Sequence, residues 1–168
     1  MANNYNDYAI IRVTPTLTTG AYSDGDVLFT ATEIPNAVRG NNGCSKLVNC
    51  FVLDQHKQTF DAHLVFSEAN TALGTRHATA DISDADIEAM GICGSVFVQH
   101  DVGAVADLDT SRIIQAQNMT GAGESYTPIL LQAGQDSTSV YVSAVISDGT
   151  PNFNATDDLD IILHIQYK

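Results

Sequence analysis

Several segments of this chain alternate apolar and polar side chains with a period of two residues. In 138–146, Val140, Val142 and Ile146 share one parity, whereas serines and a tyrosine take the other. Leu159–Tyr167 and Phe60–Phe66 repeat the pattern. Because successive side chains of a strand point to opposite faces, each segment predicts a strand with one face in a core. A mainly helical fold would need apolar residues three or four positions apart.

The same pattern, in longer or shorter form, marks nine candidate strands. They are Tyr8–Leu17, Asp26–Thr32, Lys46–His56, Phe60–Phe66, Gly94–His100, Arg112–Asn118, Thr127–Ala133, Thr138–Ile146 and Leu159–Tyr167. Clusters of Gly, Asn and Asp separate them, and several clusters are longer than a two-residue hairpin turn requires. We therefore expect an all-β fold, a two-sheet β-sandwich of jelly-roll or Greek-key type with eight or nine strands.

One candidate strand, Lys46–His56, is apolar on both faces, so we expect it to be central and covered on both sides or partly by a neighbouring subunit. Five apolar residues fall on the side of their strands opposite to the predicted core, namely Ile10, Val48, Val52, Val145 and Ile162. Two interpretations stay open for these five residues. They contact a partner or a second subunit, or they belong to the second layer of the sandwich.

One short helix is expected at Ser83–Gly91, where a serine N-cap precedes two acids and a glycine ends the segment. No linker divides the chain, so we predict an N-terminal arm at 1–9 and a single sandwich domain at 10–168. Tyr5 and Tyr8 favour an arm that is ordered on a partner over a plain disordered terminus.

The charge of the chain limits its partners. Twenty acidic residues against seven basic ones give a net charge of −13, which repels phosphate backbones and anionic lipids. No apolar run approaches the length of a membrane span, and the polar start Met1–Asp7 lacks the pattern of a signal peptide. We expect no nucleic-acid partner, no membrane partner and synthesis in a cytoplasm.

Residues of catalytic type form no recognisable motif. The histidines have neither the helical spacing of a zinc site nor the closely spaced His and Glu ligands of a cupin. The acids from Asp81 to Glu88 fail as a calcium loop, because Ala89 and Ser95 stand where glycine and glutamate are needed. No tryptophan is present for sugar stacking, and Cys44, Cys50 and Cys93 are predicted to be free thiols. These observations predict a protein that is not an enzyme and has no metal or other cofactor.

Phrases along most of the chain resemble small structural proteins of tailed bacteriophages, particularly phages of marine bacteria and cyanobacteria. The segments that carry this resemblance read VTPTLTTGAYSDGDVLF (13–29), TEIPNAVR (32–39), FSEANTALG (66–74), ISDAD (82–86) and SVYVSAV (139–145).

The resemblance implies a jelly-roll decoration, or cement, protein on the outer surface of a virion capsid. Such a protein binds the major capsid protein, stabilises the shell and forms a dimer or trimer. A glycan-recognition module of a phage head or tail fibre is the first alternative. A β-sandwich hydrolase or metal enzyme is the second.

Overall fold

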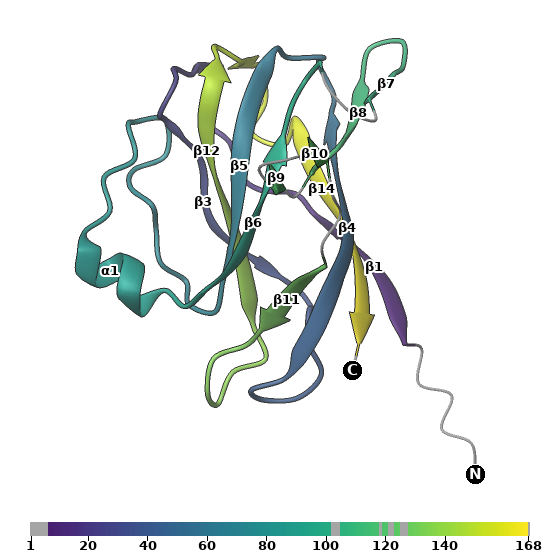
Figure 1. Ribbon diagram of the computed structural model, residues 1–168. Coiled ribbons are helices and arrows are strands. Elements are labelled where there is room, and N and C mark those ends of the chain that lie inside the picture. Colours follow the sequence, from purple (N-terminus) through teal and green to yellow (C-terminus); the bar gives the residue numbers. More distant parts are fainter. Residues whose placement is uncertain (1–6, 102–104, 118, 121–122, 125–127, 168) are drawn as a thin grey trace.

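A computed structural model describes residues 7–101, 105–117, 119–120, 123–124 and 128–167, and it consists of two facing antiparallel sheets (Figure 1). The first sheet contains β1 (Tyr8–Val13), β14 (Leu159–Tyr167), β4 (Cys44–Asp54), β8 (Arg112–Gln115), β7 (Val105–Asp107) and β11 (Ile129–Gln132). The second sheet contains β3 (Val27–Ile34), β12 (Val140–Gly149), β5 (Phe60–Ser67) and β6 (Ile92–Val98). Two short ribbons pair β2 (Gly20–Ala21) with β13 (Asn152–Phe153) and β9 (Met119–Thr120) with β10 (Gly123–Glu124).

The strand order in the two sheets is that of a jelly roll. The first sheet runs β1-β14-β4-β8-β7, with β11 also paired to β4, and the second runs β3-β12-β5-β6. Strands that neighbour each other in a sheet are therefore mostly distant in the chain, and the chain crosses repeatedly from one layer to the other. This interleaving is what two nested Greek keys produce. The predicted all-β sandwich class is confirmed.

The core fills the space between the sheets with the inward-facing members of the alternating pattern. Phe60, Ala62, Leu64 and Phe66 of β5 are all buried, and the residues between them are more exposed. Along β14 the inward positions 159, 161, 163 and 165 are buried in the same way. A close-packed interior of this kind comes directly from the period of two in the sequence.

The connection between β5 and β6 packs on part of the outer face of the second sheet. It carries the helix α1 (Asp84–Ala89), which lies beside β3 in Figure 1. Leu73 and Met90 pack on Val27 to form a second, smaller apolar cluster, against which Val145 also packs. The predicted helix is confirmed: Ser83 is its N-cap and accepts a hydrogen bond from the Asp86 backbone N–H at 3.2 Å, while Gly91 follows its last turn with φ +60°.

All nine predicted segments contain a strand, and the differences are at their ends. The strand predicted at Tyr8–Leu17 ends at Val13, shortly before Pro15, whereas β12 continues to Gly149. Tyr8 and Ala9, which we placed in an arm, are the first residues of β1 and pair with Gln166 and Ile165. Asp7 is described just before them, and residues 1–6 of that arm lie outside the described residues.

Replacing a core aromatic tests the packing between the sheets. Phe66 has no exposed surface, so Phe66→Ala should lower the free energy of unfolding by about 3–5 kcal/mol through lost burial and the remaining cavity. The control Ile92→Ala removes an apolar side chain that is 54% exposed and should change stability by less than about 0.5 kcal/mol. Urea unfolding followed by circular dichroism measures both variants, and equal losses would contradict this assignment of the core.

Candidate functional site

The outward side of the first sheet carries a group of apolar side chains that no second layer covers within the described residues. Tyr8 and Ile10 on β1 are 60% and 72% exposed, and Val48 on β4 is 41% exposed. Leu130 on β11 is also exposed, and half-buried apolar side chains continue the surface across the sheet. We call this surface the outer sheet face and define it by Tyr8, Ile10, Val48, Phe51, Leu53, Ile113, Leu130 and Ile162.

A bulge in β4 decides which of its residues reach this face. The pairing between β14 and β4 shifts register where Ile165 faces Leu47 and His164 faces Asn49, so Val48 has no partner across the ladder. The extra residue reverses the parity of the strand. Val48 therefore points outward with Lys46, whereas Cys50 and Val52, two and four residues later, point into the core.

Val52 corrects one sequence-based interpretation. We grouped it with Val48 as a candidate contact residue, because the two valines share a parity in an unbroken strand. In the structure Val52 is only 3% exposed and lies in the main core. The bulge separates the two residues, and Val52 has no surface to offer a partner.

The other predicted contact residues fall into three groups. Tyr8, Ile10, Val48 and Ile162 lie on the outer sheet face. Val145 lies on the outward side of the second sheet, where its own chain packs against it, so it fits the interpretation as part of a second layer. Tyr5 lies outside the described residues.

Four residues of the outer sheet face were missed as candidates: Phe51, Leu53, Ile113 and Leu130. A signal for two of them was present, because Lys46–His56 reads as apolar on both faces. Register joins the other two to this surface, since Ile113 faces Leu53 and Leu130 faces Lys46 across neighbouring strands. No local pattern in β8 or β11 shows that their exposed residues share a surface with β4.

The outer sheet face differs in charge from the rest of this acidic chain. Arg12 and Lys46 are exposed on it. The single carboxylate among the outward positions of β1, β14 and β4 is that of Asp160, whose side chain is fully buried beneath Arg12. Asp160 accepts hydrogen bonds from the Arg12 guanidinium and, at 2.5 Å, from the Thr14 hydroxyl.

Two opposing effects act on Asp160. Burial raises the pKa of its carboxyl group, but the hydrogen bonds and positive charge of Arg12, with the Thr14 hydroxyl, outweigh burial and lower the pKa below its usual value. Asp160 is therefore ionised at neutral pH, and its charge is neutralised locally. As a result, the outer sheet face presents apolar and cationic groups on a chain of net charge −13.

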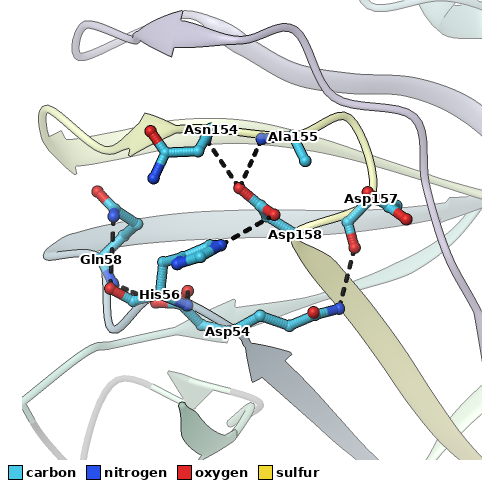
Figure 2. A network of polar contacts seen from close by, with 8 residues as sticks. Asp54, His56, Gln58, Asn154, Ala155, Asp157 and Asp158 are labelled. Carbon is cyan, nitrogen blue, oxygen red and sulfur yellow. Dashed lines mark hydrogen bonds and ion pairs between the residues drawn. The ribbon is translucent and has the colours of Figure 1, made fainter. Parts of the chain in front are cut away.

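A second polar cluster lies where β4 ends and β14 begins (Figure 2). Asp158 accepts hydrogen bonds from the backbone N–H groups of Asn154 and Ala155 at 2.8 and 2.9 Å, and its other oxygen lies 3.2 Å from His56 Nε2. Asp54 accepts from the backbone of His56 at 2.9 Å and from that of Gln58. Burial raises the pKa of Asp54, and these hydrogen bonds act in the opposite direction. Both carboxylates bind backbone donors of tight turns, which is a structural use of the acid.

Three groups that could ligate a cation lie together where β5 begins and where the chain leaves β6. The ligand atoms of Asp61, His100 and Asp101 are all within 4.8 Å of one another. Asp61 Oδ1 is also the partner of the His100 backbone N–H at 3.1 Å and lies 2.9 Å from His100 Nδ1. These two contacts connect the end of β6 to β5 and account for the position of both side chains.

The remaining histidines and cysteines are distributed separately over the fold. His63 stacks on Phe97 and His164 on Phe51, on outward positions of different sheets, and His77 Nε2 lies 2.8 Å from the Ala21 carbonyl oxygen. All three cysteines are free thiols. Burial raises the pKa of Cys50 to about 12, so its thiol stays protonated at neutral pH and is a poor nucleophile.

Two hollows lie on the surface of the described residues. One, of about 550 Å³, lies where Arg39 stacks over the ring of Tyr167. The other, of about 340 Å³, lies between His100, Asp101, Asp107 and Arg112, where Arg112 donates a hydrogen bond of 2.8 Å to Asp107.

Comparison with models of known protein families gives no match, and neither does comparison with curated protein sequences. No helix among the described residues is long and apolar enough to span a membrane.

Neighbouring aspartates test the structural use of the cluster in Figure 2. Asp158→Asn should lower the free energy of unfolding by about 1–3 kcal/mol, because an amide replaces the buried acceptor of two backbone N–H groups. The control Asp157→Asn changes an exposed side chain and should cost less than about 0.5 kcal/mol. Urea unfolding measures the free energy of unfolding of both variants. A similar loss in both would contradict a structural role for Asp158.

The lowered pKa of Asp160 makes a pH-dependent prediction. A carboxyl group whose pKa falls on folding stabilises the folded state above its unfolded pKa of about 3.9, and this contribution disappears as pH falls through the folded value. Asp160→Asn should therefore destabilise the protein at pH 7, and the difference from wild type should shrink as the pH falls below about 4. Urea unfolding of both proteins between pH 7 and pH values below about 4 measures this difference in the free energy of unfolding. A difference that does not change with pH would show that the charge of Asp160 is not stabilising.

Proposed function

We propose that this protein is a non-enzymatic virion protein that decorates the outer surface of a phage capsid and stabilises the shell. The outer sheet face is the single observation on which this proposal rests. Apolar residues scattered singly are common on protein surfaces, but several exposed apolar side chains gathered on one uncovered sheet face are typical of an interaction site. The resemblance to phage structural proteins supplies the kind of partner, the major capsid protein.

Charge supports the choice of this face for docking. Elsewhere the chain is strongly acidic, which keeps copies of a protein soluble and apart at high local concentration. The outer sheet face instead presents Arg12 and Lys46 around apolar side chains, and its one carboxylate is buried. A capsid surface with apolar and acidic groups would complement it.

A protein that stabilises the capsid shell needs only modest affinity at each contact with a capsid subunit. A decoration protein that touches more than one capsid subunit gains from the high effective concentration of neighbouring sites. A sheet face suits such a role, because its strands hold the contacting side chains at fixed spacing. The polar clusters described above lie at the ends of the sandwich and contribute by holding its turns.

The proposal is tested with empty shells assembled from a tailed-phage major capsid protein. The purified protein should sediment with these shells to a saturating stoichiometry and raise their temperature of disruption. Val48→Asp places a charge on the outer sheet face and should weaken binding at least about tenfold.

The matched control is Ile92→Asp, which places the same charge at an exposed position of the second sheet. This variant should bind like wild type. Absence of co-sedimentation would overturn the capsid role, and equal behaviour of the two variants would overturn the assignment of the face. Binding to an array of host-surface glycans in place of shells would favour the recognition-module alternative.

A further inference from the structure

The edge of the first sheet at β1 is a strand with self-complementary hydrogen-bonding groups. In Figure 1, β1 forms the margin of the sheet, with β14 on its inner side. Its six residues pair with β14 in unbroken register from Tyr8 to Val13. Among the described residues, no other strand pairs with the free edge of β1.

The register identifies which backbone groups of β1 face outward from the sheet. The Tyr167 backbone N–H donates to the Asp7 carbonyl oxygen at 2.8 Å, so Asp7 and Tyr167 are a hydrogen-bonded pair of the antiparallel ladder. Such pairs alternate along a ladder. Ala9, Ile11 and Val13 therefore bond to β14, and the N–H and C=O groups of Tyr8, Ile10 and Arg12 point to the free edge.

Proteins normally protect a free edge with a bulge, a proline, a lysine, an inward charge or a covering loop. The other long edges of this fold have such protection. Residues 76–79 bridge the start of β3, whose pairing with β12 is also irregular, and Gln117 bridges β6 at Phe97. β1 has no proline, lysine or bulge, and its one charged residue, Arg12, is paired to Asp160 within the same sheet.

We infer that β1 pairs in antiparallel fashion with β1 of a second copy of this chain, so that two first sheets form one continuous sheet around a two-fold axis. This inference concerns the isolated protein and is independent of the capsid role. Strand addition of this kind depends mainly on main-chain hydrogen bonds. The outward N–H and C=O groups of β1 are complementary to those of another β1 in antiparallel orientation. We therefore assign the pairing strand to a second copy of this chain.

Two constraints select one register for the pairing. Residues that face each other must point to the same side of the sheet, so Ile10 can face Tyr8, Ile10 or Arg12 of the other copy, but not Ala9 or Ile11. The number of bonds between outward groups is greatest when Ile10 faces Ile10, because Tyr8 and Arg12 then also face each other. In this register the two Ile10 side chains, each 72% exposed in one chain, cover one another.

The local charge at β1 does not oppose this contact, although each chain carries a net charge of −13. The outward positions of the paired strands are tyrosine, isoleucine and arginine, so the join brings no carboxylates together. The Asp7 residues of the two copies lie at opposite ends of the β1–β1 contact. The dimer also places two outer sheet faces side by side on the same surface.

The association is tested by sedimentation equilibrium of the full chain. We expect the weight-average mass to rise with concentration toward twice the 17.9 kDa of the chain. A six-residue edge buries less than a standard interface of about 1,600 Å², so dissociation upon dilution is expected. A mass that stays at that of one chain up to about 1 mM would overturn the inference.

Substitutions at Ile10 separate edge pairing from association through the outer sheet face. Ile10→Pro removes an N–H that points to the free edge and leaves the bonds to β14 in place, so it should raise the dimer dissociation constant at least about tenfold. The matched control Ile10→Thr keeps this N–H and strand propensity, and should raise the constant by no more than about fivefold. Circular dichroism verifies that both variants fold.

Amide hydrogen exchange provides a readout that does not depend on a substitution. The amides of Tyr8, Ile10 and Arg12 should gain protection as the protein concentration rises, whereas those of Ala9 and Ile11 are protected throughout by β14. Association without this alternating protection, or without sensitivity to Ile10→Pro, would show that the chains pair elsewhere and would overturn the inference.

Discussion

The ladder between β4 and β14 is the constraint on which the rest of the first sheet depends. The two strands pair along nearly their full lengths, and every other strand of the sheet is added to one of them or to β8. Because side chains alternate along a strand, the register of this ladder determines which residues enter the core. The bulge at Val48 is therefore more than a local irregularity: it keeps Leu47 and Cys50 buried on the same side.

The surface properties of the sandwich follow from that register. The second sheet is covered on part of its outward side by the connection from β5 to β6, which contributes to a separate apolar cluster. The first sheet has no such cover among the described residues, and its outward positions carry Ile10, Val48 and Ile162. The outward sides of the two sheets thus differ, since one is partly covered by its own chain and the other has no such cover among the described residues.

Polar groups in the fold mainly secure the ends of strands. Asp158 binds the turn before β14, Asp54 binds the turn after β4, and Asp61 binds the end of β6. Asp160 neutralises Arg12 on the edge strand β1. Each of these four carboxylates therefore has a structural partner, and the excess of acidic over basic residues gives the chain its net charge of −13.

The sequence by itself determined the β-class, the positions of nine strands, the short helix and the acidic character of the chain. These are local properties, since alternation, turn residues and capping act over a few positions. Only the tertiary structure decided that Val48 faces outward and Val52 inward, that Val145 is covered, and that Ile113 and Leu130 share a face with β4. These outcomes depend on a bulge and on pairing between distant strands, and no short-range pattern encodes which distant strand a residue will face.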